Sequence, residues 1–276
     1  MSELKYAFLI LLLIVISIGI PIIILFQIER VRKNKFKIWM KTIITFFSSI
    51  LLMITFICTY LGVFYRADSI AYDALKSDEI VQVYDEKDYY LFDNKENNSK
   101  AIIFYPGGKV EEAAYAPLMH NIAKEGIDVY IIKMPFHFAL FGINKANKVF
   151  DNTNYDEIYL MGHSLGGTSI SNYLSNSSYS FNGIIYLASY PTKKIPDTMS
   201  SLSIYGTNDY VLNKEEYSKS KELLPPNHYE YVIEGGNHAN FGNYGNQKKD
   251  GSSTITREYQ QELTKNEIIK YIMGTM

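Results

Sequence analysis

Three polar residues that are far apart in the sequence have the types needed for nucleophilic catalysis: Ser164, Asp209 and His238. A serine hydroxyl attacks poorly unless a neighbouring base takes its proton, and that base needs a third group to orient it. Ser164 stands in "GHSLG" (162–166), which matches the pattern G-x-S-x-G. The sequence therefore predicts acyl-group chemistry, with Ser164 as nucleophile, His238 as base and Asp209 as the orienting acid.

Each of these residues also has a purely structural interpretation. Ser164 between glycines fits a tight turn after a buried strand, and Asp209 in "TND" fits ordinary turn chemistry. His238 fits a hydrogen-bonded loop histidine, and His163 is expected to pack against the sheet. Catalysis is favoured because Ser164 lies directly after a predicted strand and directly before a predicted helix, as a nucleophile elbow requires.

The same chemistry requires hydrogen-bond donors for the negatively charged oxygen of the tetrahedral intermediate. One expected donor is the backbone N–H of Leu165, immediately after the nucleophile. The second should come from "PGGK" (106–109), which follows another predicted strand. Pro106 has no N–H, so Gly108 is the first choice and Lys109 the second.

The elements that must position these residues alternate along the chain. Apolar and β-branched runs predict strands at 79–84, 89–94, 101–106, 128–135, 157–162, 183–189, 201–206 and 228–235. Helices are expected at 111–126, 166–177, 213–224 and 253–275, the last with Ser253 or Thr254 as the capping residue. This alternation predicts an α/β fold with a mostly parallel sheet and helices on both faces. Ligands and catalytic groups gather at the C-terminal edge of such sheets.

Two long uncharged runs precede this region, at 6–28 and 42–65. Each would make a helix of roughly 35 Å, long enough for the ~30 Å hydrocarbon core of a bilayer. We therefore expect a membrane region, 1–65, of two transmembrane helices joined by a basic link, 29–41. A cleaved signal peptide or buried core helices are the alternatives, although the first run exceeds the ~7–15 apolar residues of a signal core.

The distribution of charge predicts the orientation and excludes one class of partner. The link contains six basic residues, against one before the first run and two in 66–85. The positive-inside rule then places the link in the cytoplasm and the domain 66–276 outside the cell membrane. That domain has 20 basic and 27 acidic residues, a net charge of −7. An acidic domain is a poor candidate for binding nucleic acid.

Several segments together resemble the α/β-hydrolase superfamily, and in particular its small bacterial branch. The segments are "YPGGKVE" (105–111), "MGHSLGG" (161–167), "LASYP" (187–191), "SIYGTND" (203–209) and "GGNHANFGNYG" (235–245). The resemblance implies hydrolysis of carboxylic esters without a metal or organic cofactor, with Ser164, Asp209 and His238 as the triad. The chain departs from the pattern at Tyr210, where a small residue is expected, and in having two apolar N-terminal runs. The sole cysteine, Cys58, lies in the second of these runs, so the sequence offers no thiolate metal cluster.

We therefore expect a multi-pass membrane-anchored serine hydrolase that cleaves an ester through an acyl-enzyme. An acyltransferase or an amidase or peptidase would use the same triad, and a non-catalytic membrane protein that binds through this fold is a further alternative. The link 190–199 is too short for a lid, which predicts an open site with the aromatic stretch 134–142 as its apolar wall. The substrate would be an ester or other acyl compound, derived from lipid or from the cell envelope, and membrane lipid would surround the N-terminal helices.

The predicted orientation can be tested with a protease added to intact cells. If 66–276 faces outward, the protease should remove this domain while the basic link stays protected, as detected by antibodies against each part. Full protection of the domain would contradict the orientation.

Overall fold

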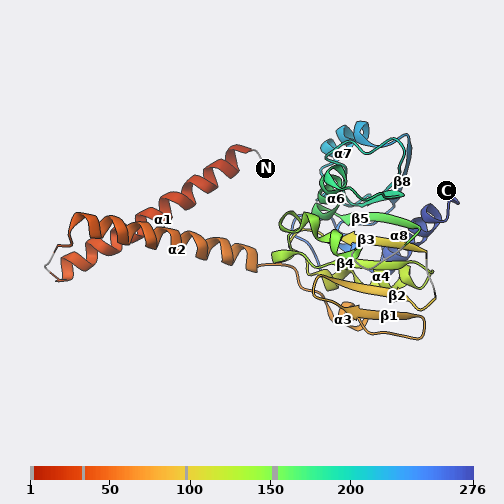
Figure 1. Ribbon diagram of the computed structural model, residues 1–276. Helices are drawn as coiled ribbons and strands as arrows, with labels where there is room; N and C mark the ends of the chain where they lie inside the picture. The colour runs from red at the N-terminus through yellow and green to blue at the C-terminus, as the bar shows by residue number, and fades with distance from the viewer. Residues whose placement is uncertain (1–2, 33–34, 97–98, 151–154) are drawn as a thin grey trace. The chain divides into compact units, whose positions relative to one another are not determined.

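The computed structural model describes residues 3–32, 35–96, 99–150 and 155–276. The chain divides into two compact units, Met1–Val63 and Phe64–Met276. The first contains two helices and the second contains the sheet with its covering helices (Figure 1).

The helices of the first unit are α1, Glu3–Arg32, and α2, Ile38–Gly62. The segments Leu11–Arg32 and Ile38–Gly62 are candidate membrane spans by length and composition, with mean hydropathies of 2.9 and 2.1. Only 17% and 0% of these apolar windows is buried, which differs from the buried core helix of a water-soluble protein. Both helices extend beyond the expected limits of 6–28 and 42–65 into the link, because charged side chains do not end a helix, whereas α2 ends at Gly62, before the expected limit of 65.

The second unit is built on one eight-stranded sheet. Its strands are β1 Val81–Asp85, β2 Tyr89–Asn94, β3 Lys100–Tyr105, β4 Asp128–Ile132, β5 Glu157–His163, β6 Gly183–Leu187, β7 Ser200–Gly206 and β8 Asn227–Ile233. Their order is β1-β2-β4-β3-β5-β6-β7-β8. The β1–β2 and β2–β4 pairs are antiparallel, and all pairs from β4 to β8 across the sheet are parallel. The mostly parallel α/β fold predicted from the sequence is therefore confirmed.

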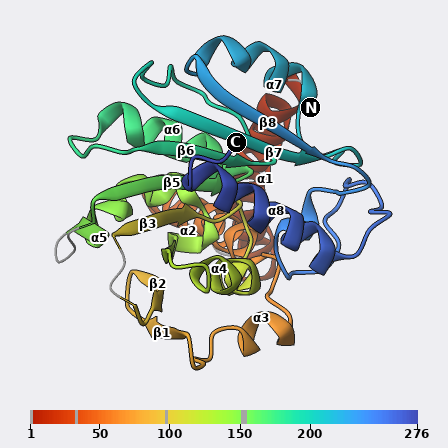
Figure 2. The same ribbon diagram turned by 90° about the vertical axis from the view of Figure 1, so that its right-hand side faces the viewer.

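Helices cover both faces of this sheet (Figure 2). They are α3 Ser69–Asp73, α4 Ala116–Ala123, α5 Asn147–Phe150, α6 Leu165–Asn176, α7 Lys214–Ser220 and α8 Arg257–Ile272. Along β3, Ile102 and Phe104 join the apolar cluster that contains α4 and α8, whereas Ala101, Ile103 and Tyr105 join the cluster that contains α5 and α6. The strands are apolar on both sides because both sides are covered.

Several local expectations were wrong. The predicted strand 128–135 ends at Ile132, and the predicted helix 253–275 spans only Arg257–Ile272. The segment 111–126 begins as a 3₁₀ turn, Glu112–Tyr115, before α4. The cap of α8 is Thr256, whose hydroxyl accepts the N–H of Tyr259 at 3.2 Å, whereas the Ser253 hydroxyl lies 2.7 Å from the carbonyl oxygen of Ile255 and 3.0 Å from that of Gly235. The helices α3 and α5 were not expected, because four or five residues are too few to show helical periodicity.

The turn from β5 into α6 depends on two glycines that allow close backbone contact. A Cβ at Gly162 would lie 2.5 Å from the backbone nitrogen of Gly167. A Cβ at Gly166 would lie 2.1 Å from the carbonyl oxygen of Tyr105 at the end of β3. The first and last glycines of G-x-S-x-G are therefore required because α6 is packed against both strands.

We expect Gly166→Ala to lower the free energy of unfolding by about 3 kcal/mol, because its methyl group would overlap backbone that cannot move independently. Chemical denaturation of the full chain measures the change. The control is Ser175→Ala, an exposed site on the same helix, which should change stability by no more than about 0.5 kcal/mol. Equal stabilities of the two variants would contradict the packing argument.

Candidate active site

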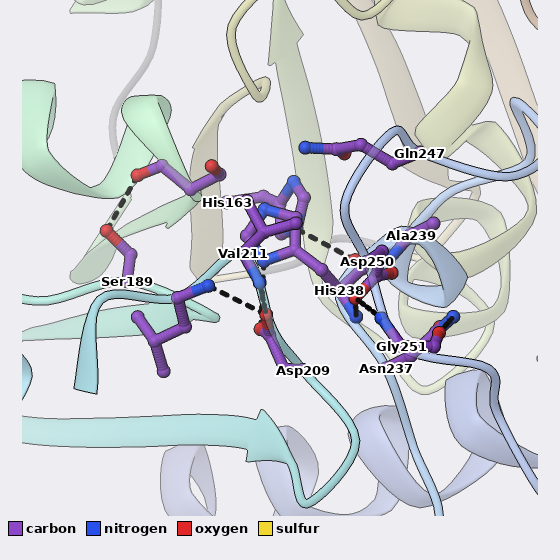
Figure 3. A network of polar contacts seen from close by, with 12 residues as sticks. His163, Ser189, Asp209, Val211, Asn237, His238, Ala239, Gln247, Asp250 and Gly251 are labelled. Atoms are coloured by element: carbon purple, nitrogen blue, oxygen red, sulfur yellow. Dashed lines mark hydrogen bonds and ion pairs between the residues drawn. The ribbon is translucent and has the colours of Figure 1, made fainter. Parts of the chain in front are cut away.

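The topology brings the three predicted triad residues to one edge of the sheet. Ser164 directly follows β5, while Asp209 and His238 lie in the loops after β7 and β8. These strands are parallel, so all three loops emerge at the C-terminal edge of the sheet. Two of these loops meet in Figure 3, where Asp209 and His238 lie together.

Ser164 has a strained backbone. Its φ of 52° and ψ of −120° lie in a region that non-glycine residues rarely adopt, at a cost on the order of 1–3 kcal/mol. Backbone bonds hold it there: its N–H donates to the carbonyl of Leu187 at 3.0 Å, and its carbonyl accepts from Gly167 at 3.0 Å. The hydroxyl of Ser189 also donates to the Ser164 carbonyl, at 2.7 Å. This is the geometry of a nucleophile elbow.

Asp209 and His238 form a buried pair. Asp209 is 0% exposed and His238 is 1% exposed, and Nδ1 of the imidazole lies 2.8 Å from Oδ2 of the carboxylate. The other carboxylate oxygen accepts the N–H groups of Val211 and Leu212, at 2.9 and 2.8 Å. A carboxylate held in this way favours a proton on Nδ1 and leaves Nε2 as the acceptor. Nε2 is buried and has no hydrogen-bond partner within the described chain.

His163 connects the elbow with this pair. Its ring centroid lies 4.6 Å from that of His238, and its Nε2 lies 3.2 Å from the His238 carbonyl oxygen. The residue directly before Ser164 thus packs on the imidazole of His238. No hydrogen bond joins the Ser164 hydroxyl to Nε2 of His238 among the described residues; such contacts are often long in the absence of substrate.

The hydrogen bonds of His163 also determine its protonation state. Its Nδ1 lies 2.8 Å from the hydroxyl of Tyr115, which accepts the N–H of Gly107 at 3.0 Å and so donates its own proton to Nδ1. Nε2 then carries the proton and donates to the His238 carbonyl. Complete burial, followed by the charge of His238, holds the pKa of His163 well below its ordinary value. His163 is therefore a neutral residue that packs on the rings of Tyr115, His238 and Phe241.

The loop after β3 has one backbone N–H that is available to a substrate. The N–H of Gly107 is taken by Tyr115, and that of Lys109 donates to the carbonyl of His137 at 2.6 Å. The N–H groups of Gly108 and Leu165 have no partner within the described residues. A Cβ on Gly108 would lie 2.7 Å from Cδ2 of Leu165, so the two residues are neighbours. This geometry favours Gly108 over Lys109.

Several supporting residues were missed from the sequence. Asp250 accepts the N–H groups of His238 and Ala239, at 3.2 and 2.8 Å, and so holds the histidine loop (Figure 3). Glu112 accepts the N–H of Met134 at 2.8 Å and lies 2.9 Å from Nδ1 of His137. No local pattern marks these residues, because their partners lie in distant segments.

Three further features describe the surroundings of the site: the exposure of Tyr210, the segment between β6 and β7, and the side chains that could bind a metal. Tyr210, the departure from the expected pattern, is 70% exposed. The segment 188–199 between β6 and β7 contains no helix or strand, so no lid is inserted there. Among the described residues, no group of three or more His, Cys, Asp or Glu side chains is arranged to hold a metal ion.

The strand order, the elbow and the paired acid and histidine together define a class of protein. The model of the alpha/beta hydrolase family matches residues 101–262, and the chain belongs to this family. No curated protein matches the sequence closely enough to count as a relative.

Solved structures share the fold at low sequence identity. The alpha/beta hydrolase domain-containing protein 10 from mouse is 12% identical with a TM-score of 0.52, covering 71% of this chain and 99% of its own. Est1E from Butyrivibrio proteoclasticus is 15% identical with a TM-score of 0.50, covering 70% and 99%. Carboxylesterase CesB from Bacillus subtilis is 10% identical with a TM-score of 0.51, covering 74% and 95%.

His163 should make stability depend on pH. Its pKa in the folded chain lies below 6.5, the ordinary value that the unfolded chain retains. As the pH falls through this value, only the unfolded chain binds a proton at His163, so its contribution to stability is present above pH 6.5 and lost below it. We expect His163→Asn to reduce the slope of unfolding free energy against pH, between about pH 6.5 and 5, by up to about 1.4 kcal/mol per unit. Chemical denaturation at several pH values measures both slopes, and equal slopes would contradict the assignment.

Proposed function

We propose that this chain is a membrane-anchored serine hydrolase that cleaves carboxylic esters. The observation that supports this most directly is the buried Asp209–His238 pair. Nε2 of His238 has no partner among the described residues, and the His238 ring packs on His163, the residue before Ser164. Family membership and the shared fold with a carboxylesterase agree with this chemistry.

The proposed reaction has two halves. In the first, Nε2 of His238 takes the proton of the Ser164 hydroxyl as Oγ attacks the ester carbonyl carbon. The tetrahedral intermediate then collapses, the bond to the alcohol breaks, and the alcohol leaves with the proton held by His238. In the second, water gives a proton to His238 and attacks the acyl-enzyme, which releases the carboxylic acid and restores Ser164.

The remaining residues would stabilise charge during these steps. Asp209 holds the imidazole with Nε2 toward the nucleophile and stabilises the imidazolium that forms. The free N–H groups of Gly108 and Leu165 would donate to the oxyanion. Each such donor contributes about 3–4 kcal/mol to the stability of a transition state of this kind. The N-terminus of α6 adds a positive dipole beside the same oxygen.

The two candidate spans would place this enzyme at the membrane. We propose that α1 and α2 both cross the bilayer, that the basic link between them lies in the cytoplasm, and that the family domain faces the opposite side.

Labelling with a fluorophosphonate probe tests the proposed nucleophile. We expect the native chain to label and Ser164→Ala to lose all labelling. Ser175→Ala, an exposed serine on the same helix, is the matched control and should label normally. A folded native chain that fails to label would favour a binding protein that keeps the fold without catalysis.

Turnover of a soluble nitrophenyl ester tests the other two residues. His238→Ala and Asp209→Asn should each lower kcat by about 10⁴-fold, because the base is either absent or wrongly oriented. The matched controls are His228→Ala, at the opposite end of β8, and Asp197→Asn, an exposed carboxylate paired with Lys194. Near-normal activity in either triad variant would break the assignment, and product analysis with added alcohols would separate hydrolysis from acyl transfer.

A further inference from the structure

The loop after β4 presents large apolar side chains to solvent. We call residues 134–142 the aromatic loop. Phe136, Leu140 and Phe141 in it are 58%, 49% and 57% exposed. Because β4 is parallel to β3 and β3 to β5, the loop emerges at the same C-terminal edge as Ser164. A group of exposed apolar side chains beside a site marks a contact surface, since folding alone would favour their burial.

Hydrogen bonds hold the aromatic loop in a strained backbone conformation. Phe136 and His137 have φ values of 55° and 53°, a conformation that non-glycine residues rarely adopt. The carbonyl of His137 accepts the N–H of Lys109 at 2.6 Å, and Nδ1 of His137 lies 2.9 Å from Oε2 of Glu112. Two consecutive strained residues persist only where their surroundings enforce them. The apolar side chains are therefore displayed by a built structure.

The same region is joined to the segment that follows α2. The ring of Phe64 lies on that of His137, with centroids 4.0 Å apart. The N–H of Tyr65 donates to the carbonyl of Lys109 at 2.8 Å, and the N–H of Glu111 donates to the carbonyl of Tyr65 at 2.9 Å. The first residues of the second unit thus pair with the loop that carries Gly108.

The length of the chain then limits how far this edge can lie from the bilayer. The candidate span α2 ends at Gly62, and only Val63 separates it from Phe64. Three residues reach at most about 10 Å, so Tyr65 remains within that distance of the end of α2. If α2 crosses the bilayer as proposed, this short connection holds the loop bonded to Tyr65 close to the end of the span.

The aromatic loop carries no formal charge that would oppose contact with lipid. Residues 134–142 contain no Lys, Arg, Asp or Glu, although the domain as a whole is acidic. The flanking Lys133 and Lys145 are paired with Asp85 and Asp88. An apolar loop without carboxylates can enter the boundary between headgroups and acyl chains without repulsion from anionic headgroups.

We propose that the aromatic loop inserts into the bilayer interface and that the ester cleaved at Ser164 belongs to a membrane lipid. The inference rests on the proposed function and names its substrate class. The lipid's acyl group would pass to Oγ of Ser164 as the bond to its alcohol part breaks, and the alcohol would take the proton from His238. Water would then release the fatty acid and return the hydroxyl proton to Ser164.

Fluorescence of a single tryptophan tests the insertion in the full chain. Trp39 is the only tryptophan, so Trp39→Phe provides a silent background for Leu140→Trp. In vesicles of phosphatidylcholine and phosphatidylglycerol, brominated acyl chains should quench Trp fluorescence at residue 140 about twofold or more. Equal emission with brominated and ordinary lipid would overturn the insertion.

The matched control is Met273→Trp in the same background. Met273 is 46% exposed and lies two residues after Tyr271. The Tyr271 hydroxyl lies 2.6 Å from the Ser200 hydroxyl, at the start of β7. Met273 is therefore near the N-terminal edge of the sheet, whereas Ser164 is at the C-terminal edge. Brominated lipid should not quench it, and quenching equal to that at residue 140 would also overturn the proposal.

Turnover provides a second, independent readout. Two turnover rates are compared: one on a long-chain nitrophenyl ester within vesicles, and one on soluble nitrophenyl acetate. The double variant Leu140→Ser/Phe141→Ser should lower the ratio of the first rate to the second by about tenfold. Met273→Ser should leave this ratio unchanged. An unchanged ratio in the double variant, with soluble turnover intact in the native chain, overturns the lipid substrate alone. Absence of soluble turnover in the native chain would instead remove the proposed function.

Discussion

The site depends on the close packing of β3, β5 and α6 at Gly162 and Gly166. With no side chain at these positions, the helix lies directly against the two strands, with room for no Cβ atom between them. Ser164 is therefore held with a φ of 52° at the tip of the turn. The strain is local, and hydrogen bonds with Leu187, Gly167 and Ser189 maintain it. The remaining residues of the site can be understood as groups brought to this fixed point.

The buried acid and histidine are the second part of this arrangement. A carboxylate that is 0% exposed would be costly without partners, and Asp209 has three, two backbone N–H groups and the imidazole of His238. His163 fills the space between this pair and the elbow as a neutral side chain, which adds no further positive charge beside His238. The Tyr115 hydroxyl donates to Nδ1 of His163 and accepts the N–H of Gly107. Because the buried Tyr115 takes the N–H of Gly107, the N–H of Gly108 is the donor that remains in that loop.

The entry of the chain into the domain is part of the same structure. Tyr65 pairs by its backbone with the loop of Gly108, and Phe64 packs on His137 of the aromatic loop. The segment that follows the candidate span α2 thus stabilises the loops around the site as well as connecting the two units. Under the proposed membrane anchoring, the three-residue connection would restrict which edge of the domain can approach lipid.

The sequence by itself determined the class of the fold and the order of the candidate site residues along the chain. Alternating apolar runs, and glycines on both sides of Ser164, are local patterns, so they suffice to predict the strand, the elbow and the following helix. The tertiary structure alone decided that Thr256, not Ser253, caps the last helix, and that Asp250 holds the loop of His238. It also left the N–H of Gly108 without a partner among the residues that the structure describes. These outcomes depend on contacts between residues distant in the sequence, and the packing that produces such contacts leaves no periodic signal in the chain.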